Sequence, residues 1–147
     1  MITATIVPGH RVASGLNGDP RFPGGTIRLQ MPAFLKHGID LGSFHPGTLN
    51  VSTAPFRHRV LRARHTVRQL KWHPVEPPED FSFFDVTVHR TDAAPVSGWI
   101  YLPHPDTKPA HFQRPDVLEL LLPWMDDVAY GSAVRLEVPA DQMAFEL

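Results

Sequence analysis

The sequence predicts an all-β fold, either a barrel or a sandwich, with one or two short helices. Its 16 prolines and 10 glycines divide the 147 residues into short pieces, and no long stretch keeps a helical repeat of apolar residues. The pieces between these breaks are rich in β-branched and aromatic residues, which favour short strands. With 42% hydrophobic residues, the chain can bury the core of one globular domain covering residues 1–147.

The expected elements follow in chain order, beginning with a strand at 2–7. Polar and apolar residues alternate from Thr26 to Met31, which predicts a second strand. Pro32 in a first turn and Gly38 as a stop then predict one short helix. Further strands are expected at 48–51, within 57–71, and at 81–88, 96–101, 116–122 and 133–138, with a helical turn at 123–128 and a tail at 139–147 that caps one end.

The strands at 81–88 and 96–101 should form a hairpin that carries many aromatic side chains. These side chains either fill the interior of the barrel, which is the default for large apolar groups, or wall a ring-shaped ligand. The residues concerned are Phe81, Phe83, Phe84, Trp99 and Tyr101.

Charge and composition narrow the class of protein. The formal net charge of -1 provides no global basic field for nucleic acid or an anionic membrane. The cationic run 57–71 alternates like a strand, so its charges suit a solvated face; the alternatives are a nucleic-acid patch and a contact to ligand phosphates. The absence of cysteine excludes disulfides and thiolate sites. With no signal peptide or membrane-spanning run, we expect a cytoplasmic protein, a monomer or weak homodimer, without nucleic-acid or membrane partners.

The segment 45–51 combines a Pro-Gly turn with two oxygen-bearing side chains two residues apart. If a strand begins at Thr48, its alternation puts Thr48 and Asn50 on one face and Leu49 and Val51 on the other. Hydroxyl and amide oxygens suit a hard cation, and Mg²⁺ takes one or two protein ligands while water and phosphates fill its other positions. The structural alternative is an ordinary strand threonine and a turn-forming asparagine.

Three further features concern polar sites. Glu119 interrupts the apolar run 116–122, and an unpaired buried carboxylate is costly, so we expect a polar partner, for example an arginine. Gly15 and Gly18 either bring backbone N–H groups close to an anion or form a plain hairpin loop. The nine histidines lack the spacing of zinc motifs, so we reject a zinc site.

Three motifs in this order resemble those of the archaeal CTP-dependent riboflavin kinases. Six consecutive residues, Pro46 to Val51, agree with that family's PGTLNV signature. Before them, 14–18 resembles its glycine-rich SGLGEG turn, and after them, 117–123 resembles its VLEIIAP segment. The similarity extends from about residue 9 to residue 138.

The resemblance implies a six-stranded cradle-loop barrel that transfers the γ-phosphate of CTP to the 5′-hydroxyl of riboflavin, giving FMN and CDP. Thr48 and Asn50 would hold Mg²⁺, and Glu119 would contact the flavin together with Lys108 or His111. The nucleotide contacts would lie on two segments, namely Gly15, Leu16, Asn17, Gly18 and Asp19, and Trp124, Met125, Asp126 and Asp127. No catalytic base is identified.

The chain departs from the family mainly where phosphates would bind. Asn17 and Asp19 stand in place of glycines, and Asp126 and Asp127 stand in place of a Leu-Arg pair. Two other functions are therefore compatible with the motifs. One is a barrel that binds a flavin or nucleotide without turnover, and the other is a kinase of another small alcohol.

Overall fold

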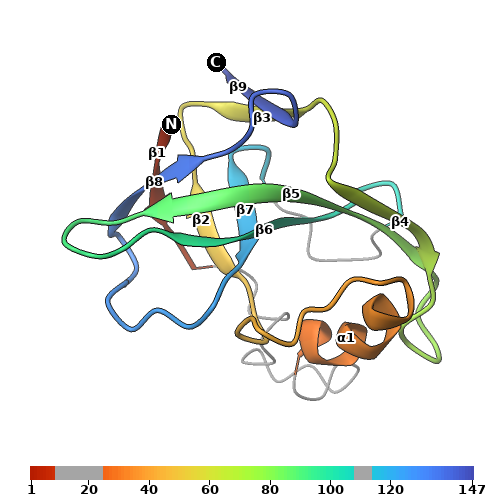
Figure 1. Ribbon diagram of the computed structural model, residues 1–147. Coiled ribbons are helices and arrows are strands. Elements are labelled where there is room, and N and C mark those ends of the chain that lie inside the picture. The colour runs from red at the N-terminus through yellow and green to blue at the C-terminus, as the bar shows by residue number, and fades with distance from the viewer. Residues whose placement is uncertain (9–24, 108–113) are drawn as a thin grey trace.

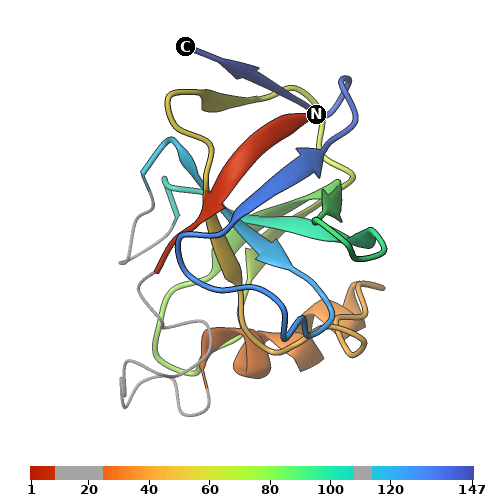
Figure 2. The same ribbon diagram turned by 90° about the vertical axis from the view of Figure 1, so that its left-hand side faces the viewer.

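Six β-strands form a closed antiparallel barrel, which confirms the all-β barrel prediction. The structure, a computed structural model, describes residues 1–8, 25–107 and 114–147. The barrel strands are β1 (Ile2–Ile6), β2 (Leu49–Ser52), β5 (Glu79–His89), β6 (Val96–Pro103), β7 (Val117–Leu121) and β8 (Ala133–Glu137). They follow the order β5, β6, β7, β2, β1, β8, and β8 pairs again with β5 to close the barrel (Figures 1 and 2).

Alternate residues of each barrel strand point into the interior and pack into one apolar core. On β5 these residues are Phe84, Val86 and Val88, each at most 2% exposed. The same side of β5 becomes polar where the strand passes beyond the barrel. There the Ser82 hydroxyl lies 2.6 Å from Nε2 of His104, so the polar side chains of this extension are paired.

Leu49 and Val51 of β2 pack against the barrel core, as the alternation predicts. Asn50 therefore faces outward, and Thr48 lies one residue before the strand begins.

A second apolar core lies outside the barrel, under the helix α1 (Thr26–Lys36). The strand predicted for Thr26–Met31 is therefore wrong, because these residues form the first half of α1. Ile27, Gln30 and Phe34 are buried on one side of the helix, at the spacing of a helical face. Pro32 is tolerated inside the helix because it faces solvent, where water can reach the carbonyl group that it leaves without an N–H partner. The helix ends before Gly38, whose φ of 81° makes it the stop that the sequence predicts.

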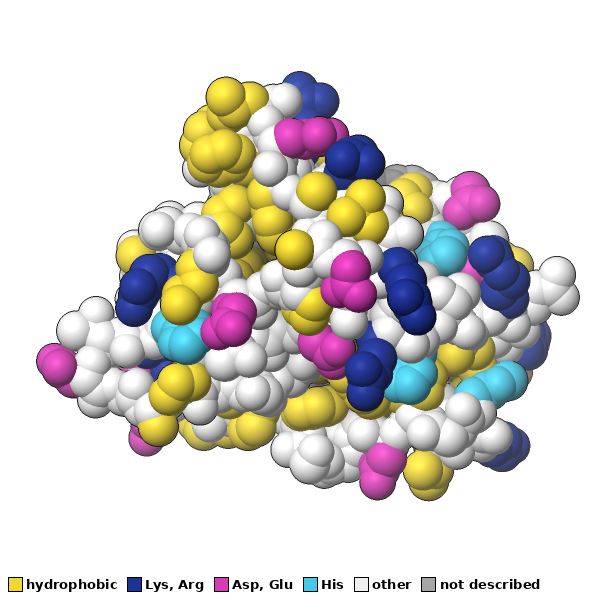
Figure 3. Space-filling view, turned by 45° about the horizontal axis from the view of Figure 1, so that its top comes forward, with side chains coloured by type: hydrophobic (Ala, Val, Ile, Leu, Met, Phe, Trp, Pro, Cys, Tyr) yellow, Lys and Arg dark blue, Asp and Glu magenta, His cyan; other side chains and the backbone are white. Residues whose placement is uncertain are grey.

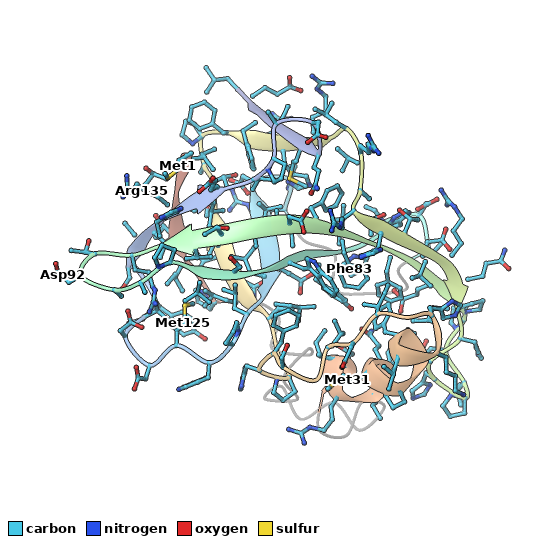
Figure 4. All side chains as sticks on the ribbon, viewed as in Figure 1. Met1, Met31, Phe83, Asp92, Met125 and Arg135 are labelled. Atoms are coloured by element: carbon cyan, nitrogen blue, oxygen red, sulfur yellow. The ribbon has the colours of Figure 1, made fainter. Side chains whose placement is uncertain are left out.

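The aromatic residues of the β5–β6 hairpin divide between the two cores. Phe84 alone lies inside the barrel, whereas Phe81, Phe83 and Tyr101 pack on its outer face, with Trp99 at the edge of the same layer. Figure 4 shows Phe83 on the barrel side of this layer and Met31 on α1. Most of these rings therefore pack in the core under α1 and not in the barrel interior.

The cationic run 57–71 forms two strands, as its alternation predicts. β4 (His65–Leu70) pairs with the first half of β5, and β3 (Arg57–Val60) pairs with β9 (Met143–Glu146) in a separate two-stranded ribbon. The ribbon lies over the end of the barrel opposite α1 (Figures 1 and 2). Met143 and Phe145 pack from it onto the barrel core, so the tail does cap one end.

The helical turn expected at 123–128 is wrong, because this segment contains a turn but no helix. Within the described ranges α1 is the one helix. None of the helical structure in the described part of the chain is long and apolar enough to cross a lipid bilayer.

Gly98 should be required for the pairing of β6 with β7. A Cβ atom at this position would lie 2.1 Å from the carbonyl oxygen of Leu121, far inside van der Waals contact. Gly98→Ala should therefore lower the free energy of unfolding by roughly 2 to 4 kcal/mol, because the backbone must shift. Urea denaturation tests this, with Ser97→Ala on the exposed side of the same strand as the control. Equal stability of the two variants would contradict the close approach.

Stability should depend on pH through His58, which pairs across the ribbon with Phe145. Burial lowers the pKa of His58 below its ordinary 6.5, and a hydrogen bond to the backbone of Pro115 opposes this shift. As the pH falls, the unfolded chain takes up the proton first. The contribution of neutral His58 to the free energy of unfolding is therefore complete above pH 6.5 and is lost as the pH falls toward the lowered pKa. Urea unfolding at about pH 7.5 and about pH 5 should show a smaller acid loss in His58→Gln than in the unmodified chain. Identical losses would exclude His58 as the cause.

Candidate functional site

A row of polar side chains crosses neighbouring strands on the outer face of the barrel. Asn50 on β2 lies directly opposite Glu119 on β7, and Glu119 lies opposite Tyr101 on β6. The next position across β5 is Phe83, so the row runs from amide and carboxylate groups into the aromatic layer under α1. Side chains directly opposite each other on antiparallel strands are close neighbours.

Thr48 joins this row from the turn before β2. Its hydroxyl group donates a hydrogen bond of 3.2 Å to Oε1 of Glu119. Asn50 and Glu119 are each 8% exposed, and Thr48 is half-buried. The polar partner expected for Glu119 is thus found, and hydroxyl, amide and carboxylate groups from two distant segments share one small region of the outer face.

The backbone around Asn50 is firmly held. Its carbonyl oxygen accepts a hydrogen bond of 2.9 Å from the N–H of Val7, just beyond β1. Nearby, the N–H of His45 donates to the carbonyl oxygen of Leu122 at 2.9 Å, which ties the Pro-Gly turn to the end of β7. Both ends of the motif are therefore anchored to the barrel.

Tyr101 and Gln30 belong to the same region, although the sequence analysis did not select them as site residues. The Tyr101 hydroxyl donates a hydrogen bond of 2.7 Å to Oε1 of Gln30 on α1, and both residues are buried. Burial is the main cause that raises the pKa of Tyr101 well above 10.0, and the negative charges of Glu119 and Glu79 raise it further.

No sequence pattern could have shown that Gln30 lies here, because its segment reads as a strand. Tyr101 could have been found from the register of β6 and β7, which places it opposite Glu119.

The segment predicted to contact a nucleotide lies beside the Pro-Gly turn. The ring of Trp124 is 71% exposed, and its centroid lies 4.8 Å from that of His45. Met125 packs instead against the barrel core, and Asp126 is exposed. Asp127 forms an ion pair with Arg90, so its negative charge is partly compensated.

The remaining predicted contacts, namely Gly15, Leu16, Asn17, Gly18, Asp19, Lys108 and His111, lie outside the described residues.

The pair formed by Thr48 and Asn50 fits Mg²⁺ by the chemistry of its donors. Both side chains offer hard oxygen atoms, and Mg²⁺ usually takes few protein ligands and completes its shell with water and phosphates. Within the described ranges, no group of three or more His, Cys, Asp or Glu side chains could hold a metal ion. A cation here would therefore depend on the hydroxyl and amide oxygens of Thr48 and Asn50.

Scans of the chain against protein-family models and against curated proteins find no match. The likeness to riboflavin kinases therefore rests on the three motifs of the sequence.

Ionisation of Tyr101 should be delayed in the folded protein. The chain has two tyrosines, so Tyr101→Phe isolates the contribution of Tyr101 to an ultraviolet absorbance titration. Because the pKa is raised, the unfolded chain loses this proton first, and the stabilising contribution should fall as the pH rises above 10.0. If the titration step that Tyr101→Phe removes lies at an ordinary pH near 10.0, Tyr101 is not in the buried environment described above.

Proposed function

We propose that this protein is a Mg²⁺-dependent phosphotransferase that moves the γ-phosphate of CTP, or of another nucleoside triphosphate, to the 5′-hydroxyl of riboflavin. The observation that carries the proposal is the hydrogen bond between Thr48 and Glu119. These residues belong to two separate motifs of the riboflavin kinase resemblance, 71 positions apart. Their meeting on one face, with Asn50 beside them, is what a shared site for a metal ion and an acceptor requires.

Thr48 and Asn50 would hold the Mg²⁺ ion. When bound, the ion would neutralise charge on the phosphates of the nucleotide. The task of the chain is to present the two oxygens from a rigid position. The bonds from the Val7 and His45 N–H groups supply that rigidity, because they fix the backbone on both sides of Thr48.

Glu119 would accept a hydrogen bond from a hydroxyl or ring N–H group of the acceptor molecule. The Glu119 side chain is already oriented, because it is buried and the Thr48 hydroxyl holds one of its oxygens. In the reaction, a new bond forms between the acceptor oxygen and the γ-phosphorus as the bond from that phosphorus to the bridging oxygen breaks. The hydroxyl proton passes to solvent, and CDP leaves. Positioning supplies most of the catalysis in such transfers, so no general base is assigned.

Trp124 and His45 would bound the nucleotide side of the site. Trp124 is the exposed aromatic residue of this segment, and an aromatic ring can stack with any nucleobase. The ion pair of Asp127 with Arg90 reduces the repulsion that an acidic residue in this segment would exert on phosphates. This arrangement supports a nucleotide donor without selecting CTP over other triphosphates. A kinase of this kind would act in the cytoplasm.

A barrel that binds a flavin or nucleotide without turnover is the second candidate. The acidic pair at Asp126 and Asp127 favours it, because Asp126 has no ion pair with a described residue and would repel phosphates. A kinase of another small alcohol would use the same metal site with a different acceptor.

Formation of FMN tests the proposal directly. Purified protein is incubated with riboflavin, Mg²⁺ and each triphosphate, and FMN is followed by chromatography. Thr48→Val should lower kcat/KM by roughly 100-fold and raise the Mg²⁺ requirement, because it removes a metal-ligand oxygen. Thr48→Ser keeps the hydroxyl and serves as the matched control. Glu119→Gln should act mainly through the KM for riboflavin.

The outcomes separate the candidate functions. Absence of FMN with every triphosphate would defeat the kinase. Tight riboflavin binding in calorimetry without transfer would select the binding barrel. Equal activity of Thr48→Val and Thr48→Ser would remove Thr48 from the metal site.

A further inference from the structure

The ribbon formed by β3 and β9, at the end of the barrel opposite α1, has an open edge (Figures 1 and 2). β3 pairs with β9 alone. In that pairing Arg59 lies opposite Ala144, and Val60 lies opposite Met143. The other edge of β3 has no strand beside it in the described part of the chain.

The hydrogen bonds of the ribbon show which backbone groups face this edge. The N–H of Leu61 donates to the carbonyl oxygen of Gln142 at 2.9 Å. Since hydrogen-bonded pairs alternate along an antiparallel ladder, Arg59 and Arg57 also direct their backbone groups toward β9. His58 and Val60 must then direct their N–H and C=O groups outward, where no described residue bonds them. A strand edge with two such residues is a template for another strand.

The side chains around this edge combine positive charge with exposed apolar surface. Val60 is 47% exposed, Leu61 43% and Phe56 37%. Arg59 pairs with Glu146 at 3.3 Å, whereas Arg57 and Arg62 form no ion pair with a described residue. Figure 3 shows hydrophobic side chains beside Lys or Arg side chains at this end of the molecule. Glu146 also lies opposite Arg57 on β9, so the two arginines of β3 stand beside the one acidic residue of β9.

Two of the registers in which a second copy of the chain could pair with this edge place arginines directly opposite each other. If His58 faced Val60 of the second copy, Arg59 would lie directly opposite its own equivalent. If His58 faced the other His58, Arg57 would lie opposite Arg59. Like charges directly opposite each other destabilise a ladder. The outer edge of β9 is also partly occupied, because the N–H of Met143 donates to the carbonyl oxygen of Pro139 at 3.3 Å.

We infer that the free edge of β3 binds an extended, acidic segment of a partner protein as an added strand. The backbone groups of His58 and Val60 provide the ladder. Acidic side chains on the outward face of the added strand lie beside Arg57 and Arg59, and apolar side chains on its other face lie beside Val60. This interaction does not depend on the proposed kinase activity, because the edge contains none of the residues of the candidate site.

Binding of a short labelled peptide of alternating glutamate and valine tests this inference on the full chain. Fluorescence anisotropy should show binding that weakens with salt. Val60→Pro removes an outward N–H that the fold does not use, and should weaken binding by roughly tenfold, whereas Val60→Thr should not. Arg57→Glu should weaken binding similarly, with Arg135→Glu, on the exposed side of β8, as its control.

Amide hydrogen exchange of the unmodified chain provides a readout that does not depend on how the variants fold. The amides of His58 and Val60 should exchange quickly in the free protein and become protected when the peptide binds. The inference would be overturned if the peptide did not bind, or if it bound without protecting these amides. Equal binding of a lysine-valine peptide would also overturn it. So would concentration-dependent self-association through β3, or an oligonucleotide that protects these amides while the acidic peptide does not.

Discussion

Closure of the barrel depends on how one edge of β5 is shared between two partners. β4 pairs with this edge near Phe83, and β8 pairs with it from Thr87 onward. Between them the N–H of Asp85 would have no strand partner. Gln142 fills this gap, because its Oε1 accepts from the Asp85 N–H at 2.8 Å and its Nε2 donates to the Asp85 carboxylate at 2.8 Å. The side chain thus completes a sheet edge that no strand covers, and a buried N–H without a partner would be costly.

The same residue connects the barrel to the ribbon at its end. The carbonyl oxygen of Gln142 accepts hydrogen bonds from the N–H groups of Leu61 and Arg62. Met143, the next residue, is buried in the barrel core. One short segment therefore seals the junction on β5, holds β3 in place and closes the end of the barrel. The outward direction of the His58 backbone follows from this anchoring, since it sets which residues of β3 face β9.

The division of residues between the two faces of the barrel explains where the candidate site lies. The interior is filled by aliphatic residues and Phe84, so it has no place for a polar ligand. Polar groups with defined positions are found instead on the outer face, where Asn50, Glu119 and Tyr101 are opposite one another. Their neighbours under α1 keep them largely from water, which strengthens electrostatic interactions among them. The raised pKa of Tyr101 is one result of this environment.

The sequence by itself determined the elements whose signals are local. Strand alternation placed Leu49 and Val51 toward the core and Asn50 away from it, and the glycine at 38 marked the helix end, because these depend only on neighbouring residues. The tertiary structure decided the rest. Thr26–Met31 is helical because the outer face of β5 and β6 needs an apolar cover, which a helix supplies with Ile27 and Phe34. The contact of Thr48 with Glu119 and that of Tyr101 with Gln30 each join residues 71 positions apart. Such pairs are set by strand order and register around the closed barrel, which no local pattern of residues specifies.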